Sequence, residues 1–323
     1  MDTLSAQQSV SDEPVVVGVD GSPQARAALR AALAAAAGRS TGLVALSSYS
    51  ADLYWLGGDG VLASVVDGVR ESTRRLTEEL VASVRAEVRG AGDVPVSVEV
   101  TSEGPASGLV ARSAGAQLVV VGNRGRGAVR SALLGSVALH TVTHAHCPVL
   151  VVHPSAGRPE GNRPRVVVGV DGSETARAAL ATAVEEAVRA GAALDVLAVY
   201  ALTDYWTDLA TMILPSREAI REQLREHTTA VVEGVLTGRP PEAPVPPVEV
   251  HVVEGAASDV LVDRARDADL LVVGSSGRGS FRGLVMGSVA LHCAMHAPCP
   301  VLVVHPVGRH ARTSAGVAAS AQA

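Results

Sequence analysis

Glycine and serine occur in the same arrangement at two places in the chain. Residues 122–125 read Gly-Asn-Arg-Gly, and a Gly-Ser pair follows at 135–136 after nine residues. Residues 274–277 read Gly-Ser-Ser-Gly, and a Gly-Ser pair follows at 287–288 after the same interval. Glycine lets backbone amides approach an anion because it has no Cβ, and a helix beginning at the pair would direct its amides and dipole at a phosphate. Glycine-rich turns often serve only to turn the chain, but a spacing that occurs twice favours an anion site.

Charged residues lie close to these loops. Arg124, Arg126 and Arg278 could supply positive charge to a bound phosphate. Asp20 and Asp171 end the first strand expected in each half, where a carboxylate can accept hydrogen bonds from ribose hydroxyls or help to hold a divalent metal on phosphates. An aspartate at this place can equally well cap the helix that follows. The sequence leaves these two roles open.

Other phosphate-binding and catalytic motifs are missing. The chain contains no lysine, which excludes the P-loop lysine and Schiff-base chemistry. The first turn reads Val-Asp-Gly-Ser and not GxGxxG, so the dinucleotide fingerprint is missing as well. Ser22 and Ser173 follow this turn, but no histidine base is recognisably arranged for them, and helix capping is the better interpretation. We therefore expect no catalytic residue.

Histidine and cysteine are the remaining candidate metal ligands. His140 and His144 are four residues apart, as are His292 and His296, and this spacing can chelate a metal. No acidic or thiolate partner is predicted beside them, so we interpret them as helix-surface or interface residues. The cysteines have no metal-binding spacing and are expected to be reduced structural thiols; they are Cys147, Cys293 and Cys299. The sequence predicts no metal site built by protein ligands.

An internal duplication organises the chain. VVVGVDGS occurs at 15–22 and 166–173, and GSVALH and CPVLVVHP also occur twice in the same order. The first match repeats after 151 residues and the other two after 152, so one half has an extra residue, for which we favour the proline-rich stretch 239–247. We predict domains at 14–154 and 165–307, a linker at 155–164 and disordered ends at 1–13 and 308–323.

Strands and helices are expected to alternate within each half. Continuous apolar runs predict strands buried on both faces, at 15–20, 43–49, 96–100, 117–122 and 149–152 and again at 166–171, 194–200, 248–253, 269–274 and 301–304. The first helix is expected to stop near Gly38, and its counterpart at Gly191. Five strands alternating with four helices predict the α/β class: two tandem, doubly wound, Rossmann-like domains with five-stranded parallel sheets. Ligands bind such sheets beyond the carboxyl ends of the strands, where the strand order reverses.

Composition excludes several kinds of partner. The 323 residues are 47% hydrophobic, which is enough for two cores. A net charge of -6 and an aromatic content of 2% offer no surface suited to nucleic acid or an anionic membrane. No long apolar run or signal peptide is recognisable. We expect a cytoplasmic protein with neither partner.

Together these motifs make both halves similar to universal stress protein domains. The GxxG loop with its later G[ST] pair resembles the ATP motif of the family's nucleotide-binding branch, and VGVDGS and HCPVLVV resemble the ends of its domain. The similarity covers about 15–153 and 166–305. It implies a tandem member with adenine nucleotide alpha hydrolase-like domains, ATP as ligand, and Mg²⁺ carried on the phosphates.

The resemblance also implies positions for the nucleotide. In the family, the backbone after the second strand meets adenine, here near Ser48 and Val199, and the loop after the third strand helps to close the base pocket, here near Gly104 and Gly255. Ser48 departs from the usual apolar residue, although a backbone contact survives that change. In the first half the expected ligand contacts are Asp20, Gly21, Ser48, Gly104, Gly122, Arg124, Gly125, Gly127, Gly135, Ser136 and Val137. In the second half they are Asp171, Gly172, Val199, Gly255, Gly274, Ser276, Gly277, Gly279, Gly287, Ser288 and Val289.

The last strand of each half has the same apolar sequence, VLVV, and falls at a sheet edge in this topology. An uncovered edge of this kind promotes aggregation. We therefore expect the two halves to pack their last strands together about a pseudo-twofold axis, as the family resemblance also implies. A homodimer of the full chain stays open.

The function expected from these observations is binding. We expect an ATP-binding universal stress protein that senses or buffers adenine nucleotide at two sites per chain. A slow ATP-hydrolysing enzyme or switch is the first alternative, and a nucleotide-independent interaction scaffold is the second. Bound nucleotide would argue against the scaffold, and turnover lost in Asp20 and Asp171 variants would argue against binding alone.

Overall fold

The computed structural model describes residues 13–49, 59–126, 134–154, 163–201, 216–277 and 286–306. Apart from Glu13, the predicted disordered ends lie outside these ranges, as do most of the predicted linker, Gly127, Arg278 and Gly279.

The described residues of the first half form five strands and four α-helices in strict alternation. In chain order they are β1 (Val15–Gly18), α1 (Pro23–Arg39), β2 (Leu43–Ser48), α2 (Asp59–Arg85), β3 (Val96–Thr101), α3 (Pro105–Ser113), β4 (Leu118–Gly122), α4 (Ser136–His144) and β5 (Val149–Val152).

The described part of the second half repeats this order and adds a short 3₁₀ helix, η3. Its elements are β6 (Arg165–Gly169), α5 (Glu174–Ala190), β7 (Ala193–Tyr200), α6 (Arg217–Thr237), β8 (Val248–Glu254), α7 (Ala257–Arg264), η3 (Ala265–Asp267), β9 (Leu270–Gly274), α8 (Ser288–His296) and β10 (Val301–Val304). The predicted α/β class is confirmed.

Local capping explains where the first helix of each half begins and ends. The Ser22 hydroxyl accepts a hydrogen bond from the Ala25 amide, and Ser173 caps α5 in the same way. Gly191 ends α5 with a φ of 58°, as predicted. Helix α1 ends at Arg39, one residue after Gly38 and thus near the expected position, and Ser40 takes the left-handed conformation with a φ of 52°.

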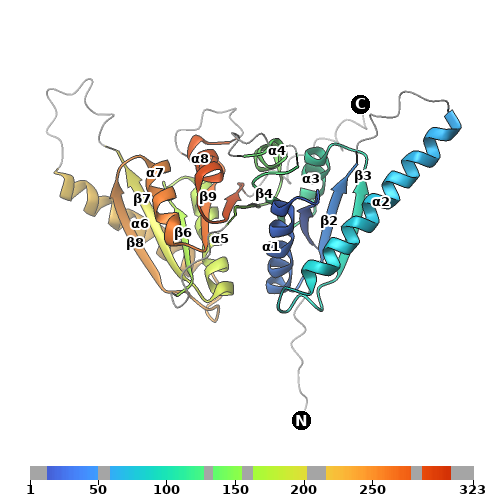
Figure 1. The fold of residues 1–323 in the computed structure, drawn as a ribbon. Coiled ribbons are helices and arrows are strands. Elements are labelled where there is room, and N and C mark those ends of the chain that lie inside the picture. The colour runs from blue at the N-terminus through green and yellow to red at the C-terminus, as the bar shows by residue number, and fades with distance from the viewer. Residues whose placement is uncertain are drawn as a thin grey trace, which may run out of the picture.

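The strands of each half form a parallel sheet whose order reverses between its first and fourth strands. The order is β3-β2-β1-β4-β5 in the first half and β8-β7-β6-β9-β10 in the second. Helices α1 and α2 pack on one face of the first sheet, and α3 and α4 on the other (Figure 1). The corresponding pairs in the second half are α5 with α6 and α7 with α8. The reversal point at the carboxyl ends of the strands is thus present twice.

The extra residue of the second half lies between its second and third strands. Leu43 pairs with Val96 in the first half, and Leu194 pairs with Val248 in the second. The second-strand residues are 151 positions apart and the third-strand residues 152. This interval contains the stretch 239–247 that we favoured for the insertion.

Strands β5 and β10 join the halves into one ten-stranded sheet. They pair antiparallel, with Leu150 opposite Leu302, and the last strand lies between the halves in Figure 1. Two buried histidines reinforce the junction. Nε2 of His153 lies 2.9 Å from the Ala294 carbonyl oxygen in the other half, and Nε2 of His305 lies 2.9 Å from that of Val142. The expected packing of the last strands is confirmed.

Burial lowers the pKa of His153, more than its backbone hydrogen bonds raise it, so the neutral imidazole donates to Ala294. Among the described helices, none combines the length and apolar character needed to cross a bilayer.

Candidate functional site

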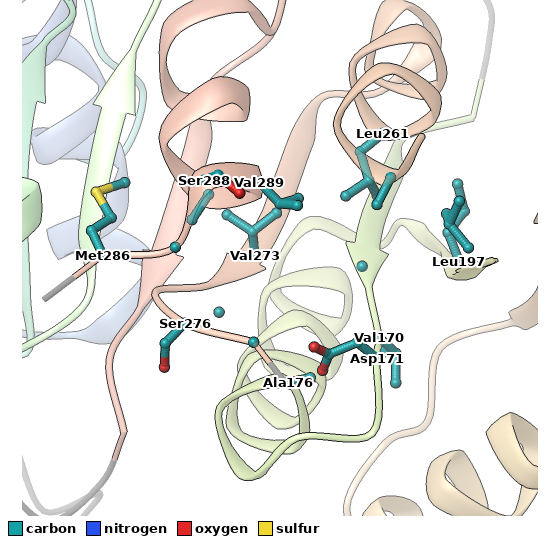
Figure 2. Close-up of a pocket in the computed structure, with 17 residues that line it drawn as sticks. Val170, Asp171, Ala176, Leu197, Leu261, Val273, Ser276, Met286, Ser288 and Val289 are labelled. Atoms are coloured by element: carbon teal, nitrogen blue, oxygen red, sulfur yellow. The ribbon is translucent and has the colours of Figure 1, made fainter. Parts of the chain in front are cut away.

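A cavity opens at the carboxyl ends of the strands in each half. Its volume is about 560 Å³ in the first half and about 400 Å³ in the second. In both halves the wall is formed by the ends of the first two and fourth strands, the loop after the fourth strand, and the N-terminal parts of three helices. Figure 2 shows the cavity of the second half, with Asp171 on one side and Ser288 and Val289 at the start of α8 on another.

The first glycine of each loop is required by helix packing. A Cβ on Gly122 would lie 3.0 Å from the backbone of Gln24 in α1, and a Cβ on Gly274 would lie 3.1 Å from the backbone of Thr175 in α5. The fourth strand therefore approaches the first helix more closely than any other residue permits. Access for an anion, the role predicted for these glycines, is therefore not their only role, because close packing of the strand against the helix also requires glycine here.

The second glycine of each loop makes room for an aspartate. A Cβ on Gly125 would lie 2.6 Å from Oδ2 of Asp20, and a Cβ on Gly277 would lie 2.6 Å from Oδ2 of Asp171. The loop after the fourth strand thus rests directly on the turn after the first strand in both halves.

Asp20 ties these two loops together. Its Oδ1 accepts a hydrogen bond of 2.9 Å from the Ser22 amide, and its Oδ2 accepts one of 2.8 Å from the Arg126 amide. Burial alone would raise the pKa of Asp20, but hydrogen bonds from Ser22 and Arg126 and the Arg126 charge together lower it. In the second half, Oδ1 of Asp171 accepts a hydrogen bond of 2.9 Å from the Ser173 amide. Each carboxylate is therefore a cavity-lining group and also a loop anchor.

The helix after each loop begins at the cavity without a side-chain cap. Gly135 and Gly287 occupy the N-cap positions of α4 and α8, and no described side chain accepts from their first turns. The Gly135 and Gly287 amides donate to the carbonyl oxygens of Asn123 and Ser275, at 2.8 and 2.7 Å, which fixes each helix against its loop. First-turn amides that lack a protein acceptor favour an anion.

The loops differ in charge between the halves. Arg124 and Arg126 both line the first cavity. Nε of Arg124 is buried and has no hydrogen-bond partner among the described residues. Ser276 takes the place of Arg124 in the second half, and its hydroxyl lies 3.1 Å from that of Thr175.

Apolar side chains form the opposite end of each cavity. Leu46 and Leu109 contribute in the first half, and Leu197 and Leu261 in the second. Ser48 lines the first cavity, and its hydroxyl donates a hydrogen bond of 2.5 Å to the Glu103 carbonyl oxygen. An apolar slot with a few polar groups at one end is typical of small-molecule sites.

Most of the expected contact residues line the two cavities. In the first half these are Asp20, Ser48, Gly104, Gly122, Arg124, Gly125, Gly135, Ser136 and Val137. In the second half they are Asp171, Val199, Gly274, Ser276, Gly277, Gly287, Ser288 and Val289. Their contact with a ligand stays a prediction.

Three of the expected residues are not among the described lining residues. Gly21 and Gly172 have φ angles of 77° and 81° and form the turn after the first strand. Gly255 is displaced by the extra residue of the second half. Gly104 is the N-cap of α3 whereas Ala256 is the N-cap of α7, so the counterpart of Gly104 is Ala256.

Sequence reasoning did not single out the leucines on the third helix or Met286. Leu109 and Leu261 each project from the helix after the third strand, and a Cβ on Gly18 or Gly169 would lie 3.0 Å from them. A glycine at the same place in both apolar first strands was the available signal. Met286 lines the second cavity, and its sulfur lies 3.9 Å from the Thr143 hydroxyl of the other half.

The helix histidines stack in pairs and the cysteines are buried. Ring centroids are 4.2 Å apart for His140 with His144 and for His292 with His296. Contrary to the expectation that no acid is beside them, Oδ1 of Asp259 lies 3.7 Å from Nε2 of His292. Burial raises the pKa of all three thiols to about 12, in agreement with inert structural cysteines.

Comparisons with known proteins agree with this architecture. The model of the universal stress protein family matches residues 13–153 and 162–305. A universal stress protein of Mycolicibacterium smegmatis is 32% identical over 302 residues, which cover 93% of this chain and 99% of that protein. The crystal structure of a universal stress protein from Archaeoglobus fulgidus has a TM-score of 0.57 at 18% identity, covering 92% of this chain and 98% of that one. A solved universal stress protein in complex with cAMP is 27% identical, covers 45% of this chain and 98% of its own, and has a TM-score of 0.33.

Proposed function

Because the chain belongs to the universal stress protein family, we propose that each half binds one ATP molecule in the cavity at the carboxyl ends of its strands. The protein then senses or buffers adenine nucleotide in a stress response, with two sites per chain. Both cavities have volumes within the range of small-molecule sites, about 300–1,000 Å³.

The N-termini of α4 and α8 support the binding of the phosphates, and this observation carries the proposal. Ser22 and Ser173 cap α1 and α5, whereas no described side chain caps α4 or α8. Helices α3 and α7 also lack a side-chain cap, but α4 and α8 are the uncapped helices that begin at the Gly-Ser pairs. Their free amides and the positive end of the dipole suit the β- and γ-phosphates of a nucleotide.

Two other parts of the cavity wall suit the adenine and the ribose of the nucleotide. Leu46 and Leu109, or Leu197 and Leu261, offer apolar walls for adenine. Asp20 or Asp171, at the turn between this slot and the glycine loop, is placed for the ribose hydroxyls or for Mg²⁺ held by the phosphates.

We place binding ahead of hydrolysis because the described lining residues include no histidine, cysteine or lysine that could activate water. Asp20 is a poor base, since two backbone amides already donate to its carboxylate and its pKa is lowered.

Native mass spectrometry of the purified full chain tests the proposal. We expect up to two adenine nucleotides per chain after addition of ATP and Mg²⁺. A protein that stays free of nucleotide at saturating ATP would support the scaffold alternative and overturn the proposal.

Single-turnover hydrolysis separates binding from catalysis. We expect ATP to be recovered intact after many binding lifetimes. A fast turnover that disappears in the Asp20→Asn and Asp171→Asn variants would show instead that the protein is an ATP-hydrolysing enzyme.

A further inference from the structure

Three potential metal ligands converge near the amino ends of the strands in the second half, away from the loops of the cavity. They are Asp195 on β7 and Glu249 and His251 on β8. One ligand atom from each lies within 4.8 Å of the others. This is the only such group among the described residues, whereas the sequence predicted no metal site.

Strand alternation places the three side chains on one face. Leu194 and Val196 flank Asp195 and belong to the core under α5 and α6, so Asp195 points to the opposite face. Val248 and Val250 pack against that same core, so Glu249 and His251 point away from it as well. Asp195 is directly opposite Glu249 in the parallel pairing. The convergence is therefore set by the register of the sheet.

The three side chains are buried to different extents, as expected for a metal site that opens to solvent on one side. The Asp195 side chain is 2% exposed, that of His251 26%, and that of Glu249 72%. A buried carboxylate is costly without a cationic partner. Nη1 of Arg165 supplies one such partner, 2.6 Å from Oδ2 of Asp195.

The imidazole of His251 lacks a hydrogen bond on the side that faces the carboxylates. Its Nε2 is buried and has no hydrogen-bond partner among the described residues, but it lies 3.9 Å from Oδ2 of Asp195 and 3.5 Å from Oε2 of Glu249. These separations are too long for hydrogen bonds. They are close to the spacing of about 3.3 Å between ligand atoms that each lie about 2.0–2.1 Å from a tetrahedral Zn²⁺.

We propose that Asp195, Glu249 and His251 bind one Zn²⁺ ion, with water in the fourth position. His251 coordinates through Nε2, and Asp195 shares its carboxylate between the metal and Arg165, since its two oxygens have several lone pairs. Glu249 closes the site from the solvent side. The ion bridges the two outermost strands of the second half, β7 and β8.

The first half does not contain this site. The pairing of β2 with β3 places Val44 opposite Ser97 where the second half has Asp195 opposite Glu249. Glu99 takes the place of His251 and forms an ion pair with Arg112. The proposal therefore specifies one zinc ion per chain and does not depend on nucleotide binding.

Zinc titration of the chelator-treated, nucleotide-free full chain tests the proposal. With ZnCl₂ and a chromophoric zinc indicator as competitor, we expect one tightly bound ion per chain. His251→Gln and Glu249→Gln should each weaken binding by about tenfold or more, the range seen when a metal site loses a supporting group. Circular dichroism before titration checks that each variant is folded.

Matched controls identify the residues responsible. His227→Gln and Glu242→Gln change exposed side chains of the same half and should leave the affinity unchanged. Arg165→Gln removes the cation that competes for Asp195 and should raise the zinc affinity. A chain that binds no zinc, with His251→Gln lowering only its stability, would overturn the proposal and leave an ion-pair cluster. Binding lost in a His292→Gln/His296→Gln double variant but retained in His251→Gln would overturn it too.

Discussion

The loop after the fourth strand carries Arg124 in the first half and Ser276 in the second. Arg124 lines its cavity with a buried Nε, whereas the Ser276 hydroxyl interacts with Thr175 on α5. Ser48 in the first half likewise stands where Val199 lines the second cavity. The first cavity is the larger and the more polar of the two.

The backbone around these differences is the same in both halves. An aspartate accepts an amide hydrogen bond after the first strand, and glycines give the fourth strand its close approach to the first helix. The residues that fix the backbone are therefore shared by the two halves, whereas the side chains that set the charge and shape of the cavity differ. We therefore expect two sites of one type with unequal affinities, the first being stronger for a triphosphate.

The largest expected effect comes from the first glycine of either loop. Gly122→Ala forces a Cβ to 3.0 Å from the Gln24 backbone, and Gly274→Ala does the same against Thr175. Each should cost about 1–3 kcal/mol of stability through overpacking and abolish nucleotide binding in its own half. Calorimetric titration should show one site in place of two.

Gly38→Ala and Gly234→Ala are matched controls for this pair. Both glycines are helical and have nothing within 4 Å of the added Cβ, so stability should rise or stay unchanged. Loss of both sites from Gly122→Ala alone would show that the halves are coupled and would break the comparison.

Removal of the arginine that distinguishes the halves should have the next largest effect. Arg124→Ser should lower the ATP affinity of the first site by about tenfold, because charge-assisted contacts to phosphate contribute about 1.5–3 kcal/mol when buried and less when solvated. Titration at low and high salt should show two sites that now have similar affinity and salt dependence. Arg89→Ser, at an exposed position on the same half, serves as the charge control. If affinity were unaffected, Arg124 would not contact phosphate.

Asp20→Asn should produce a smaller effect that depends on pH. The folded-state pKa of Asp20 lies below its ordinary value of 3.8, so its ionised form stabilises the fold above that pH. The free energy of unfolding of the wild type should exceed that of the variant by about 1 kcal/mol at pH 6, because hydrogen bonds to a charged group contribute about 1.5–3 kcal/mol and solvent reduces this at a half-buried site. This difference should shrink as the pH falls below 3.8 and Asp20 becomes protonated. Urea unfolding at several pH values measures it, and a difference that does not depend on pH would contradict the assignment.

The smallest effect is expected from exchanging the residues after the second strands. Ser48→Val removes the hydrogen bond to the Glu103 carbonyl oxygen and makes the first site resemble the second. Adenosine affinity should change by about threefold or less, since one apolar contact replaces one hydrogen bond. Val199→Ser is the reciprocal variant and should shift the second site in the opposite direction. A large change at either site would mean that the side chain, and not only the backbone, contacts the base.

Periodicity and repetition were sufficient to predict the fold. The predicted strands fall within one or two residues of the observed ones, because fully buried parallel strands are continuous apolar runs. The end of α1 was predicted to within one residue, but its C-cap was not, because Ser40 is of a residue type that seldom adopts positive φ. Nothing in the residue type signals that exception.

The cavities were predicted less completely than the fold. Loop residues at fixed spacings could be named from the sequence, as could Asp20 and Asp171. Leu109 and Leu261 could not, because their helices reach the cavity only through tertiary packing. Ala256 was not predicted as the counterpart of Gly104, because a one-residue insertion shifts the register and that shift can be located only when the strands are paired. The cluster around Asp195 depends on the same cross-strand register.

The antiparallel pairing of β5 with β10 joins two halves of one chain, so their contact does not depend on the concentration of the protein. Two separate domains that met through this edge would part on dilution, once their concentration fell below the dissociation constant of the contact. Here the chain between Pro154 and Arg163 tethers them, so the effective concentration of one half near the other is fixed at about the millimolar level or above. The two cavities therefore stay in a one-to-one ratio and a constant relative orientation, however little of the protein a cell makes.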